Sequence, residues 1–260
     1  MLLHLVADFG TADLAFAEVA QRFARHLPDA TLWPTTVPPF ATLTAGFVAA
    51  QLALGDGPEA RAVFHNVAPR RDDEAARRDN AGERLVHARL PNGVQVVGVA
   101  SGAAFSFLAE AGAELRFVGV PSAGSQFRSR DLFPAAAVAA LRGEGLGEVV
   151  PPGFVPPVPS GRLAYRDGFG NLKTTVHAAD APEPGTTVQL TIGGKTLPAL
   201  RTGGTFAVPH GRLAFAPGSS GWPLPGGGER RWMEVFLRGG SAHEAFGRPP
   251  VEAEVAIVTG

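Results

Sequence analysis

The segment Asp167-Gly-Phe-Gly-Asn171 carries the residue types best suited to reading a polar ligand. A carboxylate accepts hydrogen bonds, a carboxamide both donates and accepts them, and a tight turn would present the two side chains together. Such a pair can read a base edge or an amino-acid head group. Asp, Gly and Asn are also ordinary turn formers, so a plain hairpin turn is the alternative.

No standard catalytic motif accompanies this segment. The chain has no cysteine, which excludes disulfides, thiolate metal sites and a cysteine nucleophile. Its seven histidines are scattered without a pair at helical ligand spacing, so we expect no metal site. No phosphate-binding P-loop and no dinucleotide glycine fingerprint follows the first strand candidate. The residues alone therefore indicate a ligand cleft without naming a reaction.

The helices and strands that would position these residues follow different patterns in the two halves of the chain. The apolar run at residues 2–6 is typical of a buried parallel strand, and Phe16, Val19, Phe23 and Leu27 recur at helical spacing. Further candidates alternate between strand and helix up to residue 141, at 31–33, 42–54, 62–67, 84–89, 94–99, about 103–111 and 131–141. We therefore predict an α/β N-terminal domain over residues 1–150.

A linker and a second domain are predicted beyond it. Residues 151–159 are rich in proline and glycine and should be extended. The apolar period then becomes two, with short strand candidates separated by Gly-rich turns at 163–166, 172–176, 188–192, 196–200, 212–215, 232–237 and 251–258. The pattern predicts an all-β C-terminal domain over residues 160–260, a sandwich or barrel, in a two-domain chain. Residues 223–229 suggest a flexible surface insertion.

Charge and hydropathy exclude some classes of binding partner. The net charge of −1 over 260 residues, with no basic cluster interleaved with aromatics, argues against an extended nucleic-acid surface. No apolar run approaches membrane-spanning length. The N-terminal apolar run is short, lacks a basic lead and is broken by Asp8, unlike a signal peptide. We expect a cytoplasmic protein with neither nucleic acid nor membrane as a partner.

Several segments match one family's motifs in the right order. Asp167 to Thr175 is similar to Asp-x-Phe-Gly-Asn-x-x-Thr-Asn, and Leu5-Val-Ala-Asp-Phe-Gly-Thr-Ala-Asp13 to Thr-Asp-Phe-Gly-x-x-Asp. Ser125 to Ala137 is similar to Thr-Phe-His-Gly-Arg-Asp-x-Phe-Ala-Pro-Ala-Ala, and Ser219-Ser-Gly221 with Met233 to Ala242 to the closing Asn-Ser-x-Gly and Glu-x-Ala-x-x-x-Gly-Asn-Ala. In these segments the chain resembles the S-adenosylmethionine hydroxide adenosyltransferases, the family that includes the nucleophilic fluorinases and chlorinases.

The resemblance implies a set of ligand-binding residues. Asp8 would accept both hydrogen bonds of the ribose diol, with helix N-capping as its alternative role. Asp13 and Asp167 would hold the methionine ammonium, and Asn171 would face the adenine edge. The remaining implied residues are three aromatics of the adenosine pocket, a serine placed where the halogenases bind their anion, and a serine of the closing motif: Phe40, Phe127, Phe169, Ser129 and Ser220.

The chain departs from the family at the water-activating residues. Ala68 stands where the hydrolases have Asp, and Arg128 where they have His; the Arg partner could be Arg77 or Arg78. No catalytic residue is therefore assigned, and of an enzyme and a non-catalytic protein we favour the S-adenosylmethionine hydrolase. The implied function is cleavage of S-adenosylmethionine at C5′, with water as the default nucleophile and adenosine and methionine as products. The alternatives are a catalytically impaired binding protein for S-adenosylmethionine or adenosine, and a halide-using relative.

The resemblance also implies how the site is assembled. It predicts a homotrimer whose sites lie between subunits, no cofactor, and S-adenosylmethionine as substrate or ligand.

Overall fold

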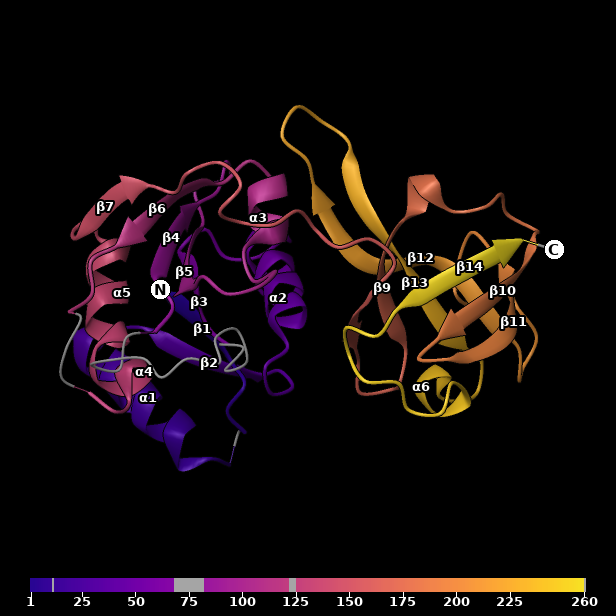
Figure 1. The fold of residues 1–260 in the computed structure, drawn as a ribbon, viewed down its shortest axis with the longest axis horizontal. Helices are drawn as coiled ribbons and strands as arrows, with labels where there is room; N and C mark the ends of the chain where they lie inside the picture. The colour runs from indigo at the N-terminus through magenta and orange to yellow at the C-terminus, as the bar shows by residue number, and fades with distance from the viewer. Residues whose placement is uncertain (11, 68–81, 122–124, 260) are drawn as a thin grey trace. The chain divides into compact units, whose positions relative to one another are not determined.

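The chain divides into two compact units, Met1–Pro157 and Val158–Gly260, and the division falls within the predicted linker. The computed structural model describes residues 1–10, 12–67, 82–121 and 125–259 (Figure 1). Two large sheets and few helices make up the described part of the chain, so the prediction of a mixed α/β protein is confirmed. No helix in those residues is long and apolar enough to cross a membrane.

Unit 1 is built on a seven-stranded sheet. Its strands are β1 (Leu2–Ala7), β2 (Thr31–Thr36), β3 (Arg61–Asn66), β4 (Leu85–Arg89), β5 (Gln95–Val99), β6 (Glu114–Val118) and β7 (Leu146–Val149). They lie in the order β2-β1-β3-β5-β4-β6-β7. Strands β2, β1, β3 and β5 run parallel, and β4, β6 and β7 add antiparallel pairs. The carboxyl ends of β1, β3 and β5 therefore share one edge, where α/β sheets commonly bind ligands.

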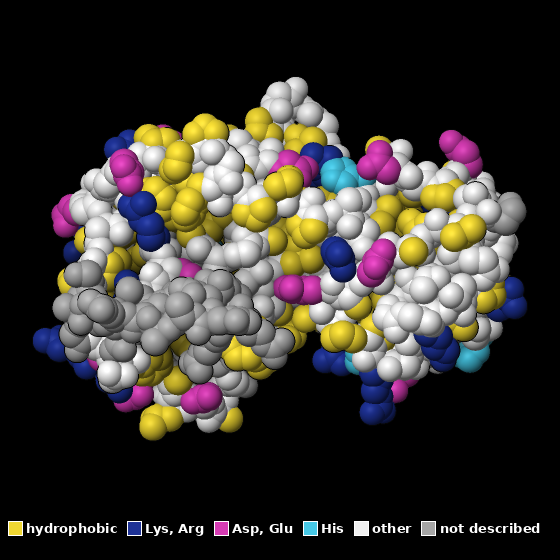
Figure 2. All heavy atoms as spheres, viewed as in Figure 1, with side chains coloured by type: hydrophobic (Ala, Val, Ile, Leu, Met, Phe, Trp, Pro, Cys, Tyr) yellow, Lys and Arg dark blue, Asp and Glu magenta, His cyan; other side chains and the backbone are white. Residues whose placement is uncertain are grey.

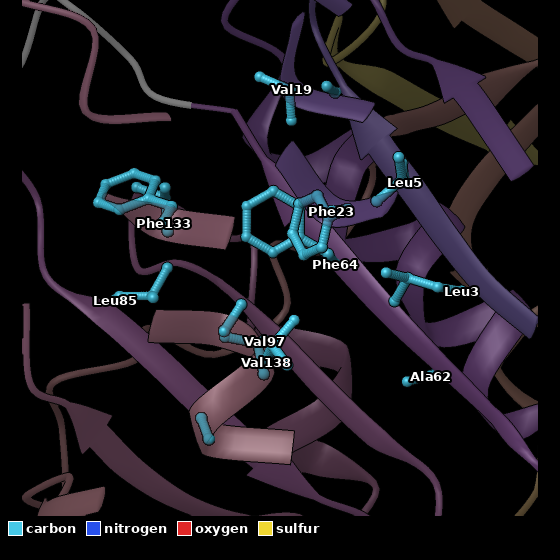
Figure 3. Packing of buried hydrophobic residues seen from close by; sticks show 14 of the residues in the cluster. Leu3, Leu5, Val19, Phe23, Ala62, Phe64, Leu85, Val97, Phe133 and Val138 are labelled. Atoms are coloured by element: carbon cyan, nitrogen blue, oxygen red, sulfur yellow. The ribbon is translucent and has the colours of Figure 1, made fainter. Parts of the chain in front are cut away.

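Helices cover both faces of this sheet (Figure 1). They are α1 (Leu14–His26), α2 (Thr42–Leu54), α3 (Ser106–Glu110), α4 (Arg128–Asp131) and α5 (Phe133–Leu141). Helices α1 and α5 bury an apolar core against one face, in which Phe23, Phe133 and Val138 point toward Leu85 and Val97 (Figure 3). Helices α2 and α3 pack on the other face.

Arg61 closes the end of α2, a role that the sequence pattern does not reveal. Its guanidinium donates to four backbone carbonyls around the end of that helix, those of Leu52, Ala53, Gly55 and Pro58, at 2.6–3.2 Å. Helix C-terminal carbonyls lack intrahelical partners, so these bonds satisfy groups that would otherwise need water.

Replacing Arg61 by Lys should therefore destabilise unit 1. An ammonium cannot reproduce the planar fork of donors, and we expect the free energy of unfolding in urea to fall by about 1–3 kcal/mol. Arg25→Lys, on the exposed face of α1, is the matched control and should change it by less than about 0.5 kcal/mol. Equal losses in both variants would contradict the role given to Arg61.

His65 is a titratable residue buried completely within unit 1. It lies on β3 against the ring of Phe105, with 4.7 Å between centroids, and neither ring nitrogen has a hydrogen-bond partner in the described part of the chain. A Cβ on Gly98, its neighbour on β5, would lie 2.3 Å from the imidazole. Desolvation lowers the pKa of His65 to about 3, so the ring is neutral in the folded protein.

Unit 2 contains a second seven-stranded sheet, in the order β14-β10-β11-β12-β13-β9-β8. Its strands are β8 (Leu163–Arg166), β9 (Leu172–His177), β10 (Thr187–Ile192), β11 (Lys195–Arg201), β12 (Leu213–Pro223), β13 (Glu229–Leu237) and β14 (Val255–Thr259). Leu163 N donates to Ala253 O at 2.9 Å, and Val255 N to Gly161 O at 2.8 Å, so backbone bonds join the two edge strands. The sheet curls around an apolar core that includes Leu190, Phe215 and Val235.

Three sequence expectations differ from the structure. Strands β6 and β7 had no sequence signal, because exposed and half-exposed residues make up most of each strand and break the apolar pattern. The predicted strand over residues 251–258 begins only at Val255. Residues 223–229 are the turn of the β12–β13 hairpin, with Pro223 paired to Glu229 and Leu224 N donating to Gly228 O, rather than an insertion (Figure 1).

Candidate functional site

A cavity of about 620 Å³ opens within unit 2. Its lining combines the predicted segment between β8 and β9 with the β12–β13 hairpin and the loop before β12. The residues that bear on ligand binding are Asp167, Phe169, Asn171, Lys173, Phe206 and Glu234. The structure therefore brings three of the predicted site residues, Asp167, Phe169 and Asn171, to one cavity.

Asp167 and Asn171 are joined in a turn between β8 and β9. Asp167 Oδ1 accepts from the backbone N–H groups of Phe169 and Asn171, both at 2.9 Å, and Oδ2 accepts from Asn171 Nδ2 at 2.8 Å. Gly170 has φ +83°, and a Cβ there would lie 2.0 Å from Ser241 Oγ, so only glycine fits. The segment can therefore be both a hairpin turn and a ligand-binding segment, because the turn itself orients the side-chain amide of Asn171.

The carbonyl of Asn171 is the unsatisfied group of the cavity. Asn171 is 9% exposed, and its Oδ1 is buried without a hydrogen-bond partner among the residues that the structure describes. Its amide nitrogen is already committed to Asp167. A buried acceptor without a donor costs roughly 1–3 kcal/mol, so this oxygen favours a ligand that brings an N–H or O–H.

Lys173 and Glu234 form an ion pair in the wall of the cavity. Lys173 Nζ lies 3.0 Å from Glu234 Oε2, with side chains 11% and 7% exposed, and it also donates to Ser219 Oγ at 3.4 Å. Strands β9 and β13 place the two residues directly opposite each other. Neither residue was predicted, because they are 61 residues apart and their pairing depends on the strand register.

Two aromatic rings are unusually open to solvent. Phe169 is 84% exposed at the tip of the turn, and Phe206 is 71% exposed in the loop before β12. Phe206 lies 5.1 Å from the ring of Phe236, which also lines the cavity. Phe206 was not predicted, because a lone Phe in a Gly-rich loop has no pattern that distinguishes it. Together the rings offer apolar faces on which a planar ligand can stack.

Ser220 is placed differently from its neighbour. On β12 successive side chains alternate, and Ser220 is buried at 4% exposure, outside the cavity lining, whereas Ser219 lines the cavity. The serine of this segment that lines the cavity is therefore Ser219.

In unit 1, Asp8 and Phe40 meet at the carboxyl edge of the sheet. Asp8 follows β1, and its Oδ2 accepts from the backbone N–H of Phe40 at 3.1 Å. Phe40 is 38% exposed and has φ 65°, a strained backbone conformation for a residue with a side chain. Backbone strain of this kind is often found at functional sites. The hydrogen bond to Asp8 helps to stabilise the strained conformation of Phe40.

Helix capping belongs to Asp13 and not to Asp8. Asp13 precedes α1, and its Oδ1 accepts from Ala15 N at 2.8 Å. The N-cap role considered for Asp8 is therefore wrong, because α1 begins at Leu14, six residues further along the chain. One oxygen of Asp13 carries the cap, which restricts how the carboxylate can turn toward a ligand.

Phe127, Arg128 and Ser129 lie at and within the start of α4. The half-buried ring of Phe127 contacts Phe9 at 6.1 Å between centroids, which joins this segment to the residue after Asp8. The guanidinium of Arg128 lies over the ring of Phe133 at 5.1 Å. Ser129 is half-buried on α4. Ala68, Arg77 and Arg78 lie outside the described residues.

A network of charges fixes α4 against α1. Arg130 bonds Asp131 at 2.7 Å and Glu18 at 3.1 Å, and Ser125 Oγ donates to Asp131 at 2.5 Å. Hydrogen bonds from Arg130 and Ser125 hold the pKa of Asp131 well below its usual range. The Ser125–Asp131 segment of the motif is thus held in place by its own polar side chains.

Charges of both signs are interspersed on the face shown in Figure 2. The Lys and Arg side chains of the described residues lie there singly among acidic and apolar ones.

Comparison with known proteins gives the fold and no activity. No protein-family model and no curated protein matches the chain. An uncharacterized conserved protein from Thermotoga maritima is similar in structure, with a TM-score of 0.75 at 18% identity over 98% of this chain and 100% of that one. A conserved hypothetical protein from Thermus thermophilus has a TM-score of 0.66 at 25% identity over 98% and 99% of the two chains.

Proposed function

We propose that this protein binds S-adenosylmethionine and cleaves it at C5′ with water, giving adenosine and methionine. In this proposal unit 1 is an α/β nucleoside-binding domain and unit 2 is a β domain that reads the base. No cofactor takes part. The buried, unpartnered Oδ1 of Asn171 in an aromatic-lined cavity is the observation that carries the proposal.

The features of the cavity suit a nucleoside. An exocyclic amino group of adenine would donate to Asn171 Oδ1 while the ring stacks on Phe206 and Phe236. In unit 1 the carboxylate of Asp8 is the group suited to a ribose diol, since two oxygens can accept two hydroxyl donors. Asp13 and Asp167 would attract the methionine ammonium.

The reaction requires few catalytic groups from the protein. Water attacks C5′, the C5′–S bond breaks, sulfur keeps the electron pair as the neutral thioether of methionine, and the water proton goes to solvent. Because the leaving group is already activated as a sulfonium, positioning and desolvation provide most of the rate. Without the Asp and His that the family uses, we expect slow turnover.

A second candidate is a binding protein without turnover. The observation that favours it is Arg128, which occupies the position of the family's His and packs on Phe133. A guanidinium remains protonated and cannot serve as a general base at neutral pH. The two candidates share the ligand and differ only in the fate of the C5′–S bond.

Adenosine is expected to raise the melting temperature of the wild-type protein, and Phe206→Ala should weaken its binding about tenfold through loss of stacking. Leu14→Ala, at an exposed apolar residue of unit 1, is the control and should bind normally. Chromatography after incubation with S-adenosylmethionine then separates the candidates, because adenosine above the uncatalysed background indicates cleavage. If neither nucleoside shifts the melting temperature, both candidates are wrong.

The proposed assembly is a homotrimer with sites between subunits. Light scattering tests it, and a monomer at micromolar concentration would remove this part of the proposal.

A further inference from the structure

A second cavity, of about 560 Å³, lies wholly within unit 1 and away from the carboxyl edge of its parallel strands. Most of its lining residues come from β4, β5, β6 and the end of α5. Its polar lining consists of His87, Arg89, Gln95, Glu114, Arg116 and Arg142.

The strand register places these polar residues on one face. His87 pairs with Arg116, and Arg89 pairs with both Glu114 and Gln95. Directly opposed residues of antiparallel strands project to the same side of a sheet. On this face Leu85 and Val97 belong to the apolar core beneath α5, so the polar group begins where that helix ends.

Hydrogen bonds fix the protonation pattern of His87. Gln95 Nε2 donates to Leu141 O at 3.2 Å, so the Gln95 atom 2.7 Å from His87 Nε2 is the carbonyl oxygen, which can only accept. His87 Nε2 must therefore carry the proton, and Nδ1 is left as a bare acceptor. His87 is 4% exposed, and its Nδ1 is buried with no hydrogen-bond partner in residues 1–10, 12–67, 82–121 and 125–259.

Positive charge dominates the rest of the lining. Arg116 donates to Gly147 O at 2.9 Å and lies 3.6 Å from Glu114, while Arg142 donates to His26 O at 3.2 Å. Among the described residues, Arg89 has neither a hydrogen bond nor an ion pair from its side chain. Three guanidinium groups thus face one carboxylate, and one of them is uncommitted.

We propose that this cavity binds a small oxyanion that carries a neighbouring hydroxyl group, such as a phosphate ester or a hydroxy acid. Arg89, with Arg142 and Arg116, receives the oxyanion, since guanidinium groups bind phosphate and carboxylate through paired donors. The hydroxyl donates to His87 Nδ1, the buried acceptor. The C-terminal end of α5 carries roughly half a negative charge, and the three guanidinium groups of the lining outweigh it together with Glu114.

Titration calorimetry with glycerol 3-phosphate and with lactate tests the proposal and distinguishes a phosphate from a carboxylate ligand. At least one should bind with a dissociation constant below about 1 mM, and propyl phosphate, which lacks the hydroxyl groups, should bind more weakly than glycerol 3-phosphate. Arg89→Gln should weaken binding about tenfold, whereas Arg25→Gln, the same charge change on α1, should not.

Absence of heat from both probes at about 10 mM, or equal weakening by Arg89→Gln and Arg25→Gln, would overturn the proposal. Because Arg89 is exposed, Arg89→Gln is expected to fold, and its melting temperature without ligand checks this. The inference is independent of the proposed function, and adenosine binding should be the same in Arg89→Gln as in the wild type.

Discussion

Replacing Lys173 by Met is expected to lower the free energy of unfolding by about 3–5 kcal/mol. Lys173 and Glu234 are 11% and 7% exposed and 3.0 Å apart, so the substitution leaves a buried carboxylate without its counter-ion. Glu234 cannot turn away easily, because a Cβ on Gly218 would already lie 2.2 Å from its Oε2, which shows how closely the chain packs there. Urea denaturation measures the loss.

A second substitution should restore most of this stability. In Lys173→Met/Glu234→Met both charges are gone, and we expect the free energy of unfolding to return to within about 1–2 kcal/mol of the wild type. The pair Arg231–Glu229 on the same hairpin is the exposed counterpart, at 51% and 46% exposure, and Arg231→Met should cost less than about 1 kcal/mol. A double variant as unstable as Lys173→Met would mean that the residues stabilise unit 2 separately.

Acidification is expected to destabilise unit 1 through His65. The unfolded chain takes up a proton near the ordinary pKa of 6.5, but the buried ring does so only near pH 3. The contribution is complete above pH 6.5, and it is lost progressively as the pH falls toward 3. At about 1.4 kcal/mol for each pKa unit, the loss from this one residue reaches about 2 kcal/mol at pH 5 and about 5 kcal/mol at pH 3.

His65→Leu isolates this effect. The variant should be at least as stable as the wild type at pH 7.5, since it removes two buried nitrogens without partners, and its stability should fall less steeply between pH 6.5 and 5. His4 and His87 also have pKa values lowered first by burial, so some acid sensitivity should remain. His26→Leu, at a partly exposed residue of α1, is the control. Identical pH slopes in wild type and His65→Leu would refute the assignment.

Much of unit 1 could be predicted because its central strands and helices bury continuous apolar surface. The helix over residues 42–54, closed by Gly55, coincides with α2 because every turn of that segment is apolar. Pro91-Asn-Gly93 joins β4 and β5 as an antiparallel hairpin, a connection that an Asn-Gly pair favours. Strands β6 and β7 were not predicted, because most of their residues are exposed or half-exposed and therefore show no apolar pattern.

The candidate site could be predicted only where its polar residues lie close together in one segment of the sequence. Asp167 and Asn171 could be recognised together because both belong to one turn. Lys173 and Glu234 are separated by 61 residues, and their pairing depends on a strand register that the sequence does not state. Likewise, the sequence did not show whether Asp8 or Asp13 caps α1, since the start of a helix is settled by backbone geometry.

The most direct test of the proposed function is a crystal soaked with S-adenosylmethionine. We expect a nucleoside in the unit 2 cavity, with its ring on Phe206 and an amino group within hydrogen-bond distance of Asn171 Oδ1. After a long soak we expect electron density for separate adenosine and methionine. An intact C5′–S bond in the same pose would leave binding without cleavage. An empty cavity at saturating ligand would contradict the proposed function.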